Sequence, residues 1–234
     1  CLTKNKNLLG ALFFSMAIGS KLLPLILLPF FFKRLGFKQV LAFYAYTGLF
    51  TLLLFLPLLG EAFIHGFTSS FLLYFQKFEF NASIYYIIRE IGFWMVGWNI
   101  IGTAGRWLAA AVLVSIIALA LFEDHKKHHA TGIFIWPLCI YFVLSTTVHP
   151  WYITPIVAFS LFSRYRFPLL WSFMVFLSYQ GYYTGGYDEN ALLVWIEYLA
   201  VAGMVAYEFY SKGAPETVRF NPRSWFRQAN GHRS

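Results

Sequence analysis

The feature that most limits how this chain can fold is a series of long apolar segments separated by short polar turns. The segments 39–59, 106–122 and 191–210 are long enough to cross the hydrocarbon core of a bilayer, which takes about 17–25 helical residues. Lipid offers the backbone no hydrogen-bond partner, so such segments are expected to be helical. With 59% hydrophobic and 12% charged residues, the chain also carries too little charge for a soluble domain. We therefore predict an all-α, polytopic integral membrane helix bundle with about six to eight membrane segments.

The first apolar segment, 8–32, contains two residues that a plain membrane helix avoids. Lys21 and Pro24 lie near its middle, where a lysine costs on the order of 3 kcal/mol to insert. Either Lys21 faces a polar cavity within one span, or the segment is a hairpin of two half-length helices that turns at 20–24. Basic residues flank both ends of the segment, which favours the hairpin with both ends in the cytoplasm. In both arrangements Lys21 is a candidate functional cation.

The later segments alternate across the membrane. Segment 39–59 runs outward to an external loop, 61–104, where aromatic and charged residues are mixed and interfacial helices are expected around 63–78 and 82–98. Further inward and outward passes are predicted at 106–122, 130–147, 152–163, 167–184 and 191–210, of which 152–163 is short enough to need a tilted or thinned passage. Residues 1–210 thus form the transmembrane domain, and 211–234 form a basic cytoplasmic tail.

The distribution of positive charge supports this orientation. Of the Lys and Arg residues after Phe32, all but Lys77, Arg89 and Arg106 fall in segments predicted to be cytoplasmic, where membrane proteins carry their excess of positive charge. The formal charge of +8 is therefore explained by topology. Because the basic residues do not line one polar face, no nucleic-acid partner is expected.

Several polar residues have simple structural explanations. His125, His128 and His129 stand beside two lysines in a predicted cytoplasmic turn, which favours a solvated charge run over a metal site. On the last apolar segment, Glu197 is expected to make an interior polar contact and Glu208 to lie at an interface. No cofactor is predicted, and a divalent metal ion is left open.

The stretch 146–154 is the strongest candidate for a functional surface. Pro150 lacks an N–H and biases His149 away from helical geometry, so a turn is expected between two apolar segments. That turn would place the rings of His149, Trp151 and Tyr152 together at the outer membrane face. An aromatic anchor in the headgroup layer explains Trp151 and Tyr152 equally well. An imidazole there can also bind a phosphate or transfer a proton, and flat rings beside it suit a sugar or a prenyl group.

The stretch 76–90 gathers most of the external charge. Tyr85 and Arg89 are four residues apart and would share one side of a helix, and the planar guanidinium of arginine suits phosphate recognition. The alternative is an amphipathic helix whose charges face water. Asn81 begins an Asn-Ala-Ser glycosylation sequon, which has meaning only in a secretory host.

Three motifs together resemble bacterial integral-membrane mannosyltransferases of the glycosyltransferase C superfamily. They are Gly-Ser-Lys-Leu-Leu-Pro at 19–24, Phe-Glu-Phe-Asn-Ala-Ser-Ile-Tyr-Tyr at 78–86 and Val-His-Pro-Trp-Tyr at 148–152. The resemblance covers about residues 8–210, and the second motif is the most distinctive. It implies an enzyme of the bacterial cytoplasmic membrane, with the C-terminus in the cytoplasm. The reaction would move a sugar, mannose above all, from a polyprenyl-phosphate donor to a lipid or glycan acceptor on the external face.

The resemblance also implies roles for the candidate residues. Lys21, Arg89 and His149 would bind the donor phosphate, whereas Trp151, Tyr152, Tyr85 and Asn81 would shape the sugar or prenyl site. In that superfamily the catalytic Asp or Glu lies in the first external loop, which we expect to precede this chain. None of the external acids Glu61, Glu79 and Glu90 matches that motif, so no catalytic residue is assigned. The rival hypothesis is a transporter or flippase for lipid-linked or small polar substrates, gated by the broken helix around Lys21.

Overall fold

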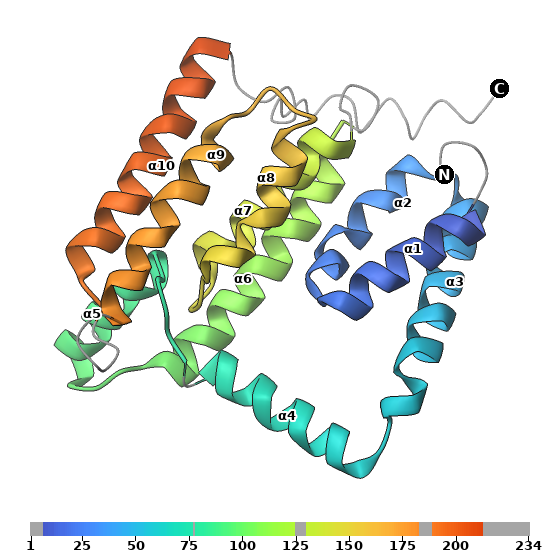
Figure 1. The fold of residues 1–234 in the computed structure, drawn as a ribbon, viewed down its shortest axis with the longest axis horizontal. Coiled ribbons are helices and arrows are strands. Elements are labelled where there is room, and N and C mark those ends of the chain that lie inside the picture. The colour runs from blue at the N-terminus through green and yellow to red at the C-terminus, as the bar shows by residue number, and fades with distance from the viewer. Residues whose placement is uncertain (1–6, 77, 125–129, 183–188, 213–234) are drawn as a thin grey trace, which may run out of the picture.

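In the computed structural model, every element of the described residues, 7–76, 78–124, 130–182 and 189–212, is a helix (Figure 1). The order is α1 (Asn7–Ser20), the 3-10 helix η2 (Leu23–Phe30), α2 (Phe31–Arg34), α3 (Phe37–Phe55), η3 (Leu56–Leu58), α4 (Glu61–Gln76), α5 (Ile84–Val96), α6 (Ile101–Phe122), α7 (Ala130–Leu144), η4 (Pro150–Tyr152), α8 (Thr154–Ser160), α9 (Phe167–Met174), η5 (Val175–Tyr182) and α10 (Ala191–Lys212). The prediction of an all-α fold is thereby confirmed for these residues. Residues 125–129 of the predicted cytoplasmic turn 123–129 and the tail beyond residue 212 lie outside them.

Three stretches are long and apolar enough to cross a membrane. They are Phe37–Leu58, Ile101–Phe122 and Ala191–Ser211. Two further apolar helices, Asn7–Ser20 and Gly132–Leu144, are shorter. The chain therefore has the helices of an integral membrane protein, and the count of six to eight membrane segments stays a prediction.

The helices α4 and α5 lie across one end of the molecule, at the bottom of Figure 1, where α3 ends and α6 begins. They correspond to the two interfacial helices expected in the external loop. Helix α5 ends at Gly97, whose φ of 81° is a left-handed geometry that glycine adopts without strain. Both helices are thus where the sequence indicated, with bounds shifted by a few residues.

The first apolar segment is broken rather than continuous. Helix α1 ends at Ser20, and η2 begins at Leu23 with Pro24 in its first turn, where the missing N–H costs nothing. Helix α1 packs along α3, and η2 contacts α1, α6 and α7. Of the two arrangements considered for 8–32, the structure has the one with two half-length helices, and Lys21 lies at the break.

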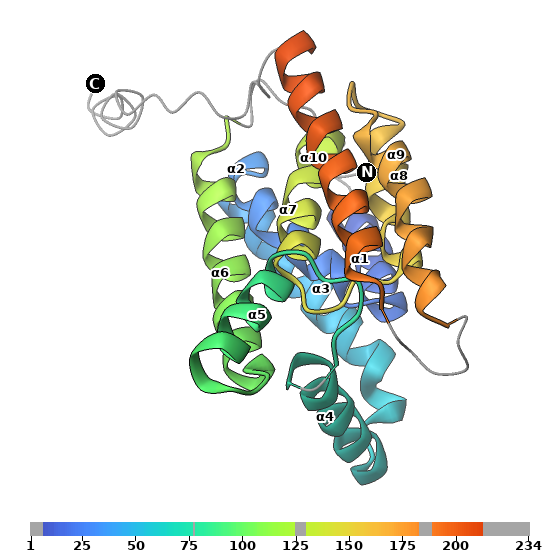
Figure 2. The same ribbon diagram turned by 90° about the vertical axis from the view of Figure 1, so that its left-hand side faces the viewer.

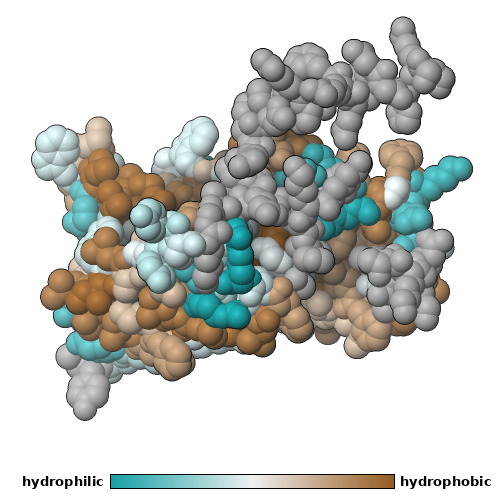
Figure 3. Space-filling model, turned by 90° about the horizontal axis from the view of Figure 1, so that it is seen from above, coloured by the Kyte–Doolittle hydropathy of each residue, from teal (hydrophilic) through white to brown (hydrophobic). Residues whose placement is uncertain are grey.

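The described helices pack around three apolar clusters. The first joins α7, α8, α9 and α10 around Trp171 and Phe142. The second joins α1, η2, α3, α6 and α7, and in it Phe31 and Phe43 place their rings 5.0 Å apart. The third, around Tyr85, fastens α5 to α6 and α10. Figure 3 shows the upper end of this assembly, where hydrophilic residues form separate groups among apolar ones.

Glu208, which the sequence analysis expected at an interface, is fully buried among the helices. Its carboxylate accepts hydrogen bonds from the backbone N–H groups of Arg166 and Phe167, at distances of 2.8–3.2 Å. These groups begin α9, and a carboxylate satisfies the free donors of a helix start. Glu208 therefore ties the start of α9 to the end of α10.

Candidate functional site

The segment 78–83, which joins α4 to α5, lies extended against the turn that follows α7. The backbone N–H of Phe80 donates to the oxygen of Thr146 at 3.0 Å, and that of Val148 donates to the oxygen of Phe80 at 2.8 Å. The Thr147 hydroxyl donates to the Phe78 oxygen at 3.2 Å. Two of the three motifs singled out in the sequence are thus held side by side by backbone hydrogen bonds.

Asn81 fastens this segment to the last helix. It is fully buried and has a φ of 47°, a geometry that asparagine tolerates better than most residues. Its side-chain Nδ2 donates to both oxygens of Glu197, at 3.2 and 3.0 Å, and Trp171 Nε1 donates to the same carboxylate at 2.9 Å. The backbone N–H of Asn81 donates to the Glu189 carboxylate at 2.7 Å. The backbone oxygen of Asn81 accepts from the Tyr198 hydroxyl, also at 2.7 Å. The interior contact expected of Glu197 is confirmed.

His149 lies at the centre of an aromatic group. Its ring stacks on Trp151, with centroids 4.5 Å apart and planes 12° apart, and it meets Phe80 at 4.6 Å and Tyr152 at 5.3 Å. The His149 side chain is buried, whereas Trp151 is 50% exposed. Burial lowers the pKa of His149, so the imidazole is neutral near pH 7. Its Nδ1 is buried without a hydrogen-bond partner among the described residues.

Lys21 reaches the same aromatic group from the break between α1 and η2. Its Nζ lies 5.3 Å from the centroid of the Tyr152 ring, within the range of a cation–π contact. The structure thus brings Lys21, His149, Trp151 and Tyr152 together, although Lys21 is far from the other three in the sequence. We call these four residues the aromatic–lysine wall.

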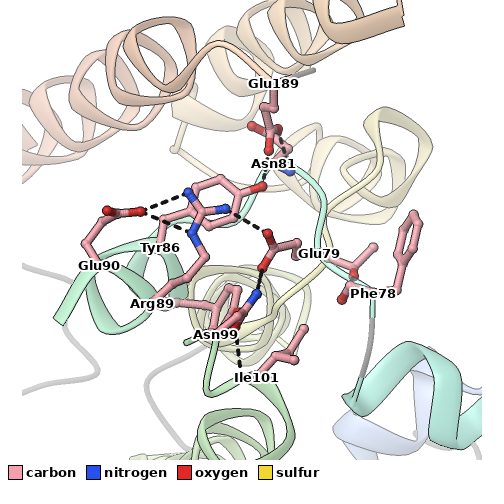
Figure 4. A network of polar contacts seen from close by, with 11 residues as sticks. Phe78, Glu79, Asn81, Tyr86, Arg89, Glu90, Asn99, Ile101 and Glu189 are labelled. Atoms are coloured by element: carbon pink, nitrogen blue, oxygen red, sulfur yellow. Dashed lines mark hydrogen bonds and ion pairs between the residues drawn. The ribbon is translucent and has the colours of Figure 1, made fainter. Parts of the chain in front are cut away.

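Arg89 belongs to a different cluster, shown in Figure 4. Its guanidinium pairs with Glu79 at 2.7 Å and Glu90 at 3.0 Å and stacks over the Tyr86 ring at 4.4 Å. Burial disfavours the charged form, but the hydrogen bond and charge of Glu79, helped by Glu90, raise the pKa of Arg89 above its usual value. Arg89 and Tyr85 lie four residues apart on α5, as expected, and the guanidinium stacks on Tyr86, three positions before Arg89.

Tyr85 is also not at an open surface. Its side chain is fully buried, and its hydroxyl donates to Asn99 Oδ1 at 2.7 Å. Asn99 in turn donates to Glu79 at 3.2 Å and accepts from the N–H of Ile101, the first residue of α6, at 3.0 Å. Burial and the neighbouring Glu79 raise the pKa of Tyr85, which keeps its hydroxyl protonated. Tyr85, Asn81 and Arg89 therefore hold the fold around segment 78–83, and their role in substrate binding stays a prediction.

Two contributors to this region were missed by the sequence analysis. Glu189 accepts hydrogen bonds from the backbone N–H of Asn81 and from the Tyr86 hydroxyl. Trp171 donates to Glu197. Only contacts with segments distant in the sequence give these two residues a role, so no local pattern could have identified them. Phe80 lies in the motif at 78–86 but was assigned no role of its own.

Two other sequence hypotheses can be compared with the structure. Among the described residues no group of three His, Cys, Asp or Glu could hold a metal ion, and His125, His128 and His129 lie outside them. The sequon at Asn81 is closed in the folded chain, since the Nδ2 atom that would carry a glycan is buried and bound to Glu197.

Comparison with family models, with curated proteins and with solved structures found no match to this chain.

Proposed function

We propose that this chain is part of a membrane glycosyltransferase that moves a sugar, mannose above all, from a polyprenyl-phosphate donor to a lipid or glycan acceptor on the external face. The observation that carries the proposal is the aromatic–lysine wall. A cation from one motif lies over an aromatic ring from another, next to a buried neutral imidazole and a half-exposed indole.

The chemistry of the wall suits a donor of this class. Loss of polyprenyl phosphate as leaving group builds negative charge on its oxygens, and the Lys21 ammonium would stabilise that charge. A neutral imidazole keeps one N–H, which His149 could donate to a phosphate or sugar oxygen. The exposed face of Trp151 offers a flat apolar surface to a sugar ring or an isoprene unit.

The described residues divide into two groups in this proposal. Lys21, His149, Trp151 and Tyr152 contact the donor. Asn81, Tyr85 and Arg89 hold segment 78–83, and through Phe80 they position the His149 ring. The base that removes the proton of the acceptor hydroxyl is assigned to none of these residues.

The test is sugar transfer from polyprenyl-phosphate mannose by membranes that contain the complete natural protein. We expect Lys21→Gln and His149→Ala each to lower the transfer rate by at least about tenfold, which corresponds to the loss of one charged or well-placed hydrogen bond. Arg106→Gln is the matched control, since this outer arginine bonds only to the Gly102 oxygen one turn earlier among the contacts described. Unchanged transfer by both wall variants, at equal protein levels, would overturn the proposal.

A transporter or flippase is the second candidate, and the helix break at Lys21 is the observation that favours it. Broken helices hold the substrate sites of many transporters. The two functions differ in their product. Movement of an intact lipid-linked sugar across proteoliposomes, without a new glycosidic bond, would favour the transporter.

A further inference from the structure

A second place in the fold has the features of a ligand site, at the opposite end of α6 from Asn99. It is a cleft of about 360 Å³ between η2–α2, the first turns of α3 and the last turns of α6. Helix α6 has 22 residues and is therefore about 33 Å long, so this cleft is far from the Asn99 cluster. It does not involve the aromatic–lysine wall.

The walls of the cleft are almost entirely apolar. From α6 come Ile117, Ala120 and Leu121, which are spaced so that they share one helix face. Pro29 and Phe32 form the opposite wall. The space between these walls is unfilled for two reasons. Ala120 has a small side chain, and η2 is a 3-10 helix, whose rows of side chains do not match those of an α-helix.

Tyr44, the neutral polar side chain of the cleft, has its hydrogen-bond partner within it. Its hydroxyl donates to the Leu28 backbone oxygen at 2.8 Å. The body of the cleft therefore suits a hydrocarbon chain. Ile117 and Phe32 are 42% and 53% exposed, so the cleft opens toward the lipid that surrounds a membrane helix.

One cation stands at the mouth of the cleft. Lys33 lines it, and its Nζ donates to the Leu121 oxygen at the end of α6, which fixes the ammonium there. An ammonium has three donors, so further N–H groups remain to bind a ligand. The neighbouring carboxylate of Glu123 is bound by Arg34, which offsets its charge. An apolar cleft with a cation at its rim matches the shape and charge of an anionic lipid.

We propose that this cleft binds one anionic phospholipid, such as phosphatidylglycerol, with its phosphate on Lys33 and the start of an acyl chain against Ile117 and Phe32. Basic pockets between membrane helices on the cytoplasmic side bind anionic headgroups in this way. A zwitterionic lipid would bring its own cation toward Lys33 and is disfavoured. The site lies at the end predicted to be cytoplasmic and is independent of the proposed glycosyltransferase activity.

The test is native mass spectrometry of the purified, delipidated protein mixed with equal amounts of phosphatidylglycerol and phosphatidylcholine. We expect one phosphatidylglycerol to be retained preferentially. Lys33→Gln should lower its retention by about tenfold, since a hydrogen bond to a charged group contributes about 1.5–3 kcal/mol and 1.4 kcal/mol is a factor of ten. Lys38→Gln removes an equal charge five residues away, outside the cleft, and should leave retention within about twofold.

A second pair of variants tests the acyl-chain part of the site. Ile117→Trp fills the cleft and should abolish retention, whereas Val114→Trp places the same indole at a 66% exposed position of α6 outside the cleft and should not. Equal retention of both lipids, equal effects of the two lysine variants, or displacement of the lipid by inorganic phosphate would each overturn the proposal. The last outcome would indicate a site for free phosphate.

Discussion

At the scale of single residues, Asn81 has a backbone conformation that few other side chains could replace. Its φ of 47° is left-handed, which costs most L-residues about 1–2 kcal/mol. Asn81→Gly and Asn81→Ala both remove the hydrogen bonds to Glu197, but only alanine adds backbone strain. We expect the alanine variant to be less stable than the glycine variant by about 1 kcal/mol in detergent unfolding experiments. Equal stability of the two variants would contradict a left-handed Asn81.

The His149 environment makes a prediction about pH. Burial lowers the pKa of the folded imidazole below its usual 6.5, so the unfolded chain binds a proton more readily than the folded chain. The stability that His149 contributes is therefore fully present above about pH 6.5 and is lost as pH falls toward the folded pKa. His149→Gln cannot titrate, so the thermal midpoint of this variant should fall less than that of the natural protein between about pH 7.5 and 5.5. Parallel curves would show that His149 is not shielded from solvent.

At the scale of helices, Gly92 of α5 lies close to Ile100, the residue that precedes α6. A Cβ at this position would lie 2.7 Å from Cγ1 of Ile100, too close for either atom. Gly92→Ala should therefore destabilise the protein by about 1–3 kcal/mol through overpacking. Gly102→Ala is the control, because a Cβ there meets nothing within 4 Å. Combining Gly92→Ala with Ile100→Ala should recover part of the lost stability, because the smaller side chain at position 100 removes the clash. A double-mutant cycle of unfolding free energies measures this coupling. Purely additive effects of the two substitutions would rule out the clash.

The helices were predicted from local signals, and their pairings were not. Pro24 and Pro150 marked breaks correctly, since the restriction that proline imposes acts on its immediate neighbours. The bridge between Phe80 and Thr147 joins segments distant in the sequence, and neither segment has a strand pattern. The ion pair between Arg89 and Glu79 was not predicted either, because it depends on where Glu79 lies, and helix spacing alone does not determine that position.

The passage predicted at 152–163 shows the limits of hydropathy for short helices. The only α-helix within it, α8, has seven residues and is about 10 Å long, so it does not cross a bilayer alone. It is packed between α7 and α9 instead. The sequence indicated that this segment is too short for an ordinary membrane span. Where the segment lies depends on the helices that pack against it, and hydropathy does not predict that packing.

At the scale of the whole molecule, the orientation in the membrane stays a prediction, and the arrangement of the helices makes it testable. In Figures 1 and 2, α4 and α5 lie at the lower end, whereas the turn between α8 and α9, which contains Arg164, lies at the upper end. From the positive-inside rule we predict that the upper end faces the cytoplasm. On this prediction the aromatic–lysine wall lies nearer the external face than the Lys33 cleft.

Cysteine labelling in intact cells tests this orientation. In a background that carries both Cys1→Ser and Cys139→Ala, Glu90→Cys places a single thiol on α5, where the glutamate side chain is 67% exposed, and Arg164→Cys places one in the turn between α8 and α9. We expect a membrane-impermeant maleimide to label the first variant in intact cells and the second only after the membrane is disrupted. The reverse pattern would put Trp151 and His149 on the side of the cytoplasm. An external polyprenyl-phosphate sugar could not reach them there, so that single result would refute both the orientation and the proposed reaction.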